Sequence, residues 1–528
     1  MGTLTIEPHY VTLPNGQIRI WRTGSGPDLV VLAGLTLAAS VVARIVGEAC
    51  PDWRVTAVEL PGIGGSSEHP ATNLDDVAAA VDTVLEECRI GPSALLAFDM
   101  AGAVVGPLAE RRARDFAALF LVGAEAAASW AARGNGPGDL APRHDGTHLT
   151  AMWAFIRDCH LLKPDDPTQP ATSGEALPSA EDLDATVTAA AVRPVRFVSL
   201  WATCAAALER AQGRSVTLAD LPGALASLRL PQGCAPLPST FPAPSGGIWH
   251  QYIETARGRV HLRRAGDMSG RPTLVIPTGG GSSAQFAPIV TGLAGDGERQ
   301  VFAVDYLGNG LSDKPEREVT IGVLAEDMAA VIEALGFQNV DVWGSHTGAL
   351  VGLELAVRYP SLVRRAVLEG PVFISPDFQH DLLSHYFPPI RPDKWGLHLQ
   401  LVWNWRRDMF MYWPWYRVER SAARQLGVPT ADELHKYAIG ILESGPTYDL
   451  AYRSAFSYDT ADRLPHLTRP ALICAGPNDM LVSGLKGAER LAVPGVEVRL
   501  TPTTVWWPDP DPLLAAETLA QYRSYLSV

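Results

Sequence analysis

The chain has 528 residues, of which 47% are hydrophobic and 19% are charged. This length is too great for a single hydrophobic core, since cores stop growing at roughly 250–300 residues, and this composition excludes wholesale disorder. The formal net charge of −14 argues against a nucleic-acid or anionic-membrane surface, because both need clustered Lys and Arg, so a small molecule is the expected partner.

The cysteines and the N-terminus indicate the chemical setting. The six cysteines show no Cys-x-x-Cys pairing, which argues against a zinc site or a disulfide framework, so no metal is expected. The apolar runs are too short or too interrupted to span a bilayer, so no membrane partner is expected. The N-terminus lacks a basic segment followed by an apolar one, which makes the cytoplasm the expected location.

The chain contains a long internal repeat. Residues 57–67 parallel residues 303–313, and residues 142–158 match residues 392–408 with seven of the seventeen positions identical. The offset stays close to about 245 residues, which is the pattern of a duplicated domain. The two halves are therefore expected to share one order of strands and helices.

A strand, a tight turn and a helix are expected around His346. Residues 340–345 lean apolar, Gly344 and Gly348 stand two positions before and two after His346, and residues 350–358 read as a helix. This stretch resembles the nucleophile elbow of the α/β-hydrolase superfamily, in its branch with a helical cap, but with histidine where serine is expected.

The resemblance extends along the second half. Residues 273–283 look like the family's oxyanion-hole strand and loop, and residues 301–313 look like the next strand with its turn. Residues 467–480 are similar to a late strand with its acid-bearing turn, and residues 496–500 to the last strand. The resemblance implies an α/β fold.

Two α/β-hydrolase-like halves with mostly parallel central sheets and helical caps are expected. The first half, residues 1–245, shows no late strands and is predicted to be truncated, with a cap at about 135–220 and a Pro-rich linker at 222–245. The second half, residues 246–528, is predicted to be complete, with a cap at about 373–463. A truncated sheet leaves an exposed edge, so the halves are expected to pair within the chain.

The resemblance places the acid at Asp479 and the oxyanion hole at the N–H groups of Gly280 and Thr347. The family's histidine should follow the last strand, where this chain has Trp506. His346 is thus expected to lie under an oxyanion hole, as a general base that removes a proton next to a carbonyl, or as a nucleophile. The lack of a second base favours the first role.

Two alternatives to catalysis by His346 are open. A polar elbow residue could persist in a decayed site by bonding to Asp479 or Glu369, so the chain could be a non-catalytic binding or scaffolding protein. Glu369 and Trp506 are expected to contact the substrate. The first-half elbow carries Asp99, which resembles the aspartate nucleophile of haloalkane dehalogenases and epoxide hydrolases, but this half has no late strand for a water-activating histidine and is expected to be inactive.

The repeated cap segment offers further candidates. Leu399, Trp403 and Arg407 fall on one face of a helix that is expected to begin near His398. His398, Trp403 and Arg407 could cover the pocket, where arginine would bind a substrate carboxylate, or they could belong to the core of the cap. No nucleotide, flavin or metal motif is visible, so no cofactor is expected, and the expected substrate is a small carbonyl or ester-type compound.

Overall fold

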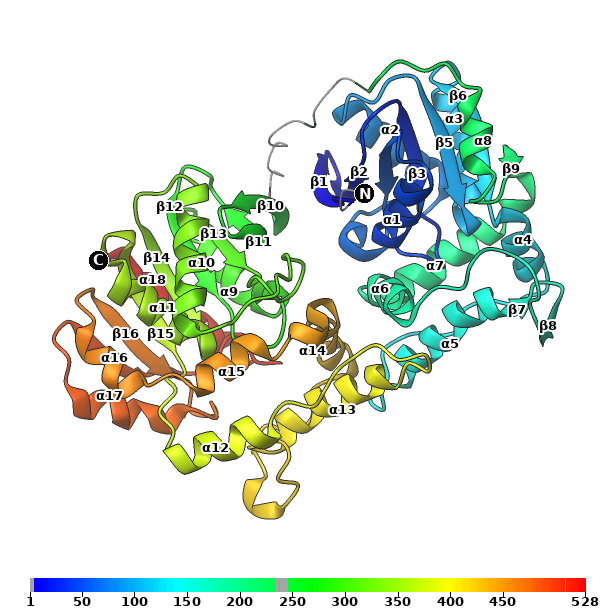
Figure 1. Cartoon of the computed structure of the whole chain (residues 1–528). Coiled ribbons are helices and arrows are strands. Elements are labelled where there is room, and N and C mark those ends of the chain that lie inside the picture. Colours follow the sequence, from blue (N-terminus) through cyan, green and yellow to red (C-terminus); the bar gives the residue numbers. More distant parts are fainter. Residues whose placement is uncertain (1–3, 234–236, 238–245, 509) are drawn as a thin grey trace. The chain divides into compact units, whose positions relative to one another are not determined.

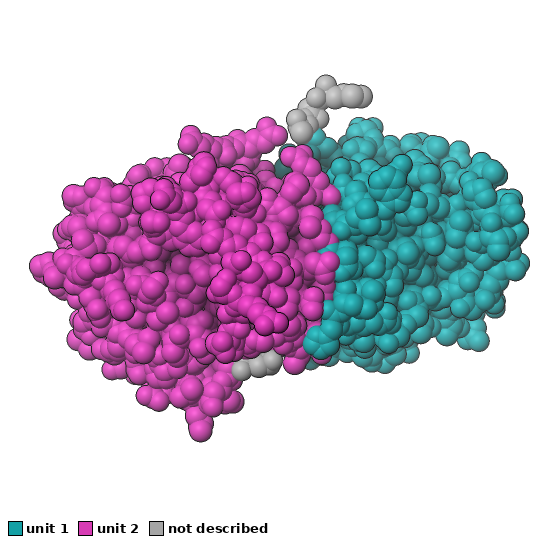
Figure 2. All heavy atoms as spheres, turned by 90° about the horizontal axis from the view of Figure 1, so that it is seen from below, with its two compact units in different colours: residues 1–244, 392–400 teal, residues 245–391, 401–528 magenta. Residues whose placement is uncertain are grey.

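The structure, a computed structural model, describes residues 4–233, 237, 246–508 and 510–528. The chain divides into two compact units, unit 1 with residues 1–244 and 392–400, and unit 2 with residues 245–391 and 401–528 (Figure 2). A short segment of the second half therefore belongs to unit 1. Among the described residues, no helix is long and apolar enough to cross a membrane.

Unit 1 is built on a seven-stranded sheet in the order β1-β2-β4-β3-β5-β6-β9 (Figure 1). Its strands are β1 (Glu7–Leu13), β2 (Gly16–Thr23), β3 (Asp28–Leu32), β4 (Arg54–Val58), β5 (Ser93–Phe98), β6 (Phe116–Val122) and β9 (Arg214–Ser215), with a separate pair β7 (Leu162–Lys163) and β8 (Asp166–Pro170). Its helices are α1 (Ala39–Ala49), α2 (Leu74–Glu87), α3 (Gly102–Arg111), α4 (Ala124–Ala132), α5 (Thr147–Leu161), α6 (Ala180–Ala191), α7 (Pro194–Ala205) and α8 (Leu221–Ala226).

Unit 2 is built on an eight-stranded sheet in the order β10-β11-β13-β12-β14-β15-β16-β17. Its strands are β10 (Trp249–Thr255), β11 (Gly258–Gly266), β12 (Arg271–Ile276), β13 (Arg299–Val304), β14 (Val340–Ser345), β15 (Val363–Glu369), β16 (Ala471–Ala475) and β17 (Val496–Leu500). Its helices are α9 (Ala287–Ala294), α10 (Ile321–Ala334), α11 (Thr347–Arg358), α12 (Pro376–His385), α13 (Leu397–Met411), whose first residues belong to unit 1, α14 (Ala431–Ser444), α15 (Leu450–Phe456), α16 (Thr460–Arg463), α17 (Leu485–Leu491) and α18 (Pro512–Ser527).

The first six strands of each sheet follow the same spatial order, as a duplication requires. In both sheets the strands from the third onward pair in parallel, and the first two hairpin strands are antiparallel. The expected α/β class with mostly parallel sheets is confirmed. Helices α12 to α16 are inserted between β15 and β16 of unit 2, in the region where the cap was predicted.

The central strand of unit 2 shows how the sheet is buried on both faces. Consecutive residues of a strand point to opposite faces. Val342 belongs to the hydrophobic core cluster that includes α10 and α11, whereas the Trp343 ring lies 5.7 Å from the ring of Phe286 and 6.2 Å from that of Tyr522 on α18. Both faces of β14 are therefore covered, which explains its near-continuous apolar sequence.

Two details of the first half differ from the sequence-based expectation. A two-residue strand, β9, pairs in parallel with β6, so the sheet is shortened there rather than ended. The expected linker begins as helix α8, because Leu221 and Leu225, four positions apart, are fully buried in the core of unit 1. Residues 234–236 and 238–245 of that linker lie outside the described residues.

A buried ion pair at the start of β14 provides a test of the unit 2 fold. Asp341 is fully buried and accepts hydrogen bonds from Arg299 at 3.0 Å and from Arg364 at 2.8 Å. Asp341→Asn removes the charge that both guanidinium groups face, so we expect it to lower the free energy of unfolding by about 3 kcal/mol. Chemical denaturation measures this change. Glu497→Gln, in the exposed pair with Arg499, is the matched control and is expected to cost less than about 1 kcal/mol; equal losses would contradict the account.

Candidate active site

The turn between β14 and α11 holds His346 in a strained backbone conformation, with φ 50° and ψ −110°. The flanking glycines make this turn possible. A Cβ on Gly344 would lie 2.3 Å from the Gly348 carbonyl oxygen, and a Cβ on Gly348 would lie 2.0 Å from the Ile276 carbonyl oxygen. Only glycine fits at either position, so the histidine side chain projects from a tightly packed strand–turn–helix.

His346 pairs with Asp479, which follows β16. Its Nε2 lies 2.9 Å from Oδ2 and 3.1 Å from Oδ1 of Asp479, and both side chains are buried. Burial would raise the pKa of Asp479, but the neighbouring His346 ring and the N–H of Leu481, at 2.7 Å, outweigh it and hold that pKa below its usual value. An ionised carboxylate only accepts hydrogen bonds, so Nε2 carries a proton, and in the neutral ring the lone pair is on Nδ1.

A second buried acid lies behind the elbow. Glu369 at the end of β15 accepts a hydrogen bond from Trp506 Nε1 at 2.7 Å and one from the Tyr522 hydroxyl at 2.6 Å. Burial raises the pKa of Glu369 to about 7, helped by the charge of Asp479 and opposed by the two hydrogen bonds. The Trp506 ring meets the His346 ring edge to face at 5.4 Å. The indole thus fills the place where the sequence suggested a missing histidine.

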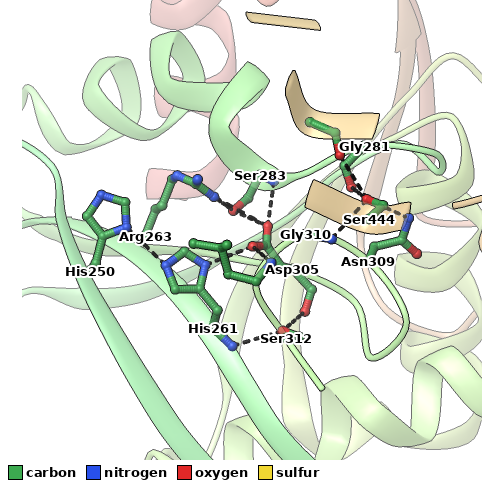
Figure 3. Close-up of polar contacts among 12 residues, drawn as sticks. His250, His261, Arg263, Gly281, Ser283, Asp305, Asn309, Gly310, Ser312 and Ser444 are labelled. Carbon is green, nitrogen blue, oxygen red and sulfur yellow. Dashed lines mark hydrogen bonds and ion pairs between the residues drawn. The ribbon is translucent and has the colours of Figure 1, made fainter. Parts of the chain in front are cut away.

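The loop that carries Gly280 is held by the buried side chain of Asp305 (Figure 3). One oxygen of Asp305 accepts hydrogen bonds from the Ser283 N–H at 2.6 Å and from the Ser283 hydroxyl at 2.7 Å. The other lies 2.8 Å from His261 Nδ1. Burial would raise the pKa of Asp305, but Arg263 and His261 hold it well below its usual range, so the acceptor stays ionised. This network fixes the loop after β12.

The inserted helix α14 ties the same loop to the turn after β13. The Ser444 hydroxyl lies 2.9 Å from the Gly310 N–H and 3.3 Å from the carbonyl oxygen of Gly281 (Figure 3). Gly280 has φ +75°, and a Cβ there would lie 2.0 Å from the Tyr452 ring. The position therefore needs glycine both for its backbone angle and for the ring above it.

The first-half elbow shows what the same backbone does with an anion. Asp99, with φ 38°, accepts hydrogen bonds from the N–H groups of Leu35 at 2.8 Å and Thr36 at 3.2 Å, from the Thr36 hydroxyl at 2.7 Å, and from the N–H of Met100. Its carboxylate is thus bound by donors from two loops. Because these donors occupy both oxygens of the carboxylate, the hydrogen bonds support a structural role for Asp99.

Strand register relates these donors to the second half. Leu32 pairs with Ala97 as Ile276 pairs with Gly344. Counting from these pairs, the N–H of Thr36 corresponds to that of Gly280, and the N–H of Met100 to that of Thr347. In the first half these two N–H groups bind different oxygens of the Asp99 carboxylate, that of Thr36 at Oδ2 and that of Met100 at Oδ1, so the turn surrounds an anionic group with N–H donors.

His346 faces a partly open cavity within unit 2, with a free volume of about 40 Å³, enough for a few water molecules. Most of the lining is aromatic or aliphatic. The polar part is formed by His346, Thr347, Thr278, Gln285, Arg406, Arg424, Tyr437 and Tyr452, and the apolar part includes Tyr386, Phe410, Trp413, Phe456, Trp506 and Trp507. Such a cavity suits a small ligand with few polar groups.

The cap residues predicted from the sequence do not line this cavity, and the interpretation needs three corrections. Arg407 is half-buried with its charge acting on Asp408, while its neighbour Arg406 faces the cavity. Trp403 is fully buried away from the lining. His398 belongs to unit 1, where its two ring nitrogens lie 2.9 Å from Asp184 and 3.2 Å from Asp393.

The physical reason lies in helix geometry and in the division of α13. Successive residues of a helix are rotated by about 100°, so a sequence stripe identifies one face without saying what that face meets. The start of α13 belongs to unit 1 and the remainder to unit 2. Arg406, Arg424 and Gln285 line the cavity and were not predicted from the sequence. Of the three, only Arg406 lies next to the expected helical stripe.

The raised pKa of Glu369 predicts a pH-dependent stability. The ordinary pKa of Glu369 is 4.5 and its pKa in the folded chain is about 7. As pH rises, Glu369 therefore loses its proton in the unfolded chain before it does so in the folded chain. Its contribution to stability falls as pH rises from 4.5 to about 7. Glu369→Gln mimics the protonated acid and removes this loss. We expect the free energy of unfolding of the variant, relative to the wild type, to rise by up to about 3 kcal/mol across that window.

The free energy of unfolding of the variant and of the wild type is measured at several pH values between 4.5 and 8. The test is how the difference between the two changes with pH, not its absolute size. Glu489→Gln, at an exposed position on α17, is the control and is expected to give a difference that is flat with pH. A flat difference for Glu369→Gln as well would show that this acid ionises normally in the folded chain.

Comparison with known proteins relates this chain to hydrolases. The putative carbamate hydrolase RutD of Caulobacter vibrioides (strain NA1000 / CB15N) is 28% identical over 250 residues, which are 46% of this chain and 84% of that protein. The 2-hydroxymuconate semialdehyde hydrolase of Pseudomonas putida is 34% identical over 124 residues, which are 23% of this chain and 43% of that protein.

Solved structures similar to this chain include E-2-(acetamidomethylene)succinate hydrolase, with 20% identity and a TM-score of 0.39 over 53% of this chain and 100% of that one. Epoxide hydrolase A from Mycobacterium thermoresistibile has 20% identity and a TM-score of 0.41 over 53% of this chain and 98% of that one. The family model described as alpha/beta hydrolase fold matches residues 27–185 and 272–526, which lie in both halves and make up more than half of the chain. The chain belongs to the α/β hydrolase fold family, in duplicated form.

Proposed function

We propose that this chain is an enzyme that acts on a small carbonyl or ester-type compound, with His346 as general base. The single observation that carries the proposal is the buried His346–Asp479 pair at the wall of an otherwise largely apolar cavity. Because Asp479 accepts a hydrogen bond from Nε2–H, the lone pair of the neutral ring is on Nδ1, and the imidazolium formed when Nδ1 takes a proton lies beside the carboxylate. The hydrolase names of the relatives support the reaction class.

The proposed step is hydrolysis through an activated water. Nδ1 of His346 takes a proton from water while the water oxygen attacks the substrate carbonyl, and the carbonyl oxygen becomes an oxyanion. The N–H groups of Gly280 and Thr347 are proposed to bind that oxyanion. The carboxylate of Asp99, which accepts hydrogen bonds from N–H groups of the corresponding loops of the first half, supports an anion site at this turn. The tetrahedral oxyanion then collapses to a carbonyl, the bond between the carbonyl carbon and the leaving group breaks, and the imidazolium gives its proton to the leaving group. The same base can also remove a proton from a carbon next to a carbonyl.

A serine mechanism is not supported by the site. Ser345 is fully buried in β14 and does not line the cavity. The position after the last strand holds Trp506, whose indole N–H is bound to Glu369 and cannot act as a base. His346 is therefore the group best placed to activate a nucleophile in this cavity.

The proposal predicts that His346→Ala lowers kcat by about 10²–10⁴-fold, the usual contribution of a general base. The substrate is sought first with a panel of small esters, carbamates, N-acyl amides and vinylogous acids. kcat is then measured by steady-state kinetics on the compound that the wild type converts, with binding followed in parallel by thermal shift.

Asp99→Ala is the matched control at the equivalent turn of the first half. It is expected to lower stability, because several donors lose a charged acceptor, and to leave kcat per folded molecule unchanged. If Asp99→Ala abolished turnover and His346→Ala did not, the first half would be the active one. Ligand binding without turnover of any compound would instead favour a non-catalytic binding protein.

A further inference from the structure

Arg406 on α13 is a buried cation without a counter-ion. Its side chain is 4% exposed and lines the cavity that contains His346. Its guanidinium contacts are the Gln285 side-chain oxygen at 3.3 Å and the Met409 sulfur at 3.4 Å. Within the described part of the chain, no carboxylate lies within ion-pair distance of it. Burying an unpaired charge lowers stability, so a buried Arg406 without a counter-ion indicates a function in binding.

Aromatic rings contact the flat faces of the Arg406 guanidinium, but they do not bind the N–H groups at its edge. The Arg406 group lies over the rings of Trp405 at 5.6 Å and Tyr437 at 5.4 Å. Cation–π contacts of this kind stabilise the flat faces and leave the N–H groups in the plane. Among the described residues, Arg406 Nε has no hydrogen-bond partner, and neither does the neighbouring Gln285 Nε2. Both residues line the cavity.

Arg424, the second arginine that lines the cavity, has hydrogen-bond partners of its own. Arg424 donates to the Met409 carbonyl oxygen at 2.7 Å. It also donates to the carbonyl oxygen of Asn478 at 3.4 Å, next to Asp479, whose charge opposes the lowering of the Arg424 pKa by burial. Glu369, the remaining acid at this site, has both oxygens bound by Trp506 and Tyr522. The positive charge of Arg406 is therefore left for a ligand.

We propose that Arg406, with Gln285, binds a carboxylate of the substrate, so the substrate class is small carbonyl compounds that carry a carboxylate. The planar fork of arginine matches a planar carboxylate, and the amide of Gln285 supplies one more donor. The aromatic walls select against additional charges. The identity of the reacting group rests on the proposed function, while the carboxylate site itself does not.

The test compares each acid with its neutral isostere. Pyruvate, acetoacetate and benzoate are titrated against pyruvamide, acetoacetamide and benzamide by ligand-observed NMR at neutral pH, with inorganic phosphate as a tetrahedral anion. The wild type is expected to bind at least one acid at least about tenfold more tightly than its amide, as expected for the loss of a charge-assisted hydrogen bond. Phosphate is expected to bind more weakly than that acid.

Arg406→Met is expected to remove this acid preference, since methionine keeps the length of the side chain without the charge. Arg407→Met, one residue along α13 and away from the cavity lining, is the matched control and is expected to keep the preference. Thermal unfolding of each variant verifies that it is folded. Equal binding of acids and amides by the wild type, equal binding of phosphate, or an acid preference that survives Arg406→Met would each overturn the carboxylate site.

His346→Ala separates this inference from the proposed function. The variant is expected to retain the acid preference, because the binding site and the base are different groups. If turnover of neutral carbonyl compounds depended on His346 while acids showed no preference, the proposed function would stand and the carboxylate site would fall. If the acid preference depended on Arg406 but no turnover depended on His346, the carboxylate site would stand and the proposed function would fall.

Discussion

The close packing of backbone at the elbow is the constraint on which the rest of the site depends. Gly348 lies so near the carbonyl oxygen of Ile276 that any side chain there would collide with β12, and Gly344 is limited in the same way by Gly348. The N–H of His346 is fixed by the carbonyl oxygen of Glu369 at 2.9 Å. These contacts join β12, β14 and β15 at one point, and they hold the histidine in a backbone conformation that it would not adopt alone.

The duplication shows two outcomes of this constraint. In the first half the elbow residue is an aspartate short enough to reach back to the N–H groups around it, so Asp99 satisfies them within its own unit. The imidazole of His346 instead turns to Asp479, which follows β16. At the first turn the Asp99 side chain therefore occupies the surrounding N–H groups, whereas at the second turn the His346 side chain lines a cavity.

Charge balance then determines what that cavity can bind. The cavity region holds two guanidinium groups, of Arg406 and Arg424, against one firmly ionised acid, Asp479. Burial raises the pKa of the other acid, Glu369, to about 7, although hydrogen bonds from Trp506 and Tyr522 oppose this shift. In a low-dielectric site an excess of one sign acts strongly on a ligand of the other.

The sequence by itself determined the parts of this protein that depend on local backbone chemistry. The spacing of Gly344 and Gly348 around His346, the turn that carries Asp479, and the long repeat could all be read directly, because tight turns allow few residue types and a duplication preserves the order of elements. From these the family, the α/β class and the pairing of His346 with an acid followed.

Only the tertiary structure decided which side chains meet at the site. The choice of Arg406 over Arg407 depends on what each face of α13 packs against, and the choice of Asp184 and Asp393 as the partners of His398 depends on the start of that helix belonging to unit 1. Likewise, the capture of Asp99 by N–H groups about sixty residues away is invisible in its own segment. Helix periodicity fixes the relative directions of neighbouring side chains, but long-range packing decides what lies in each direction.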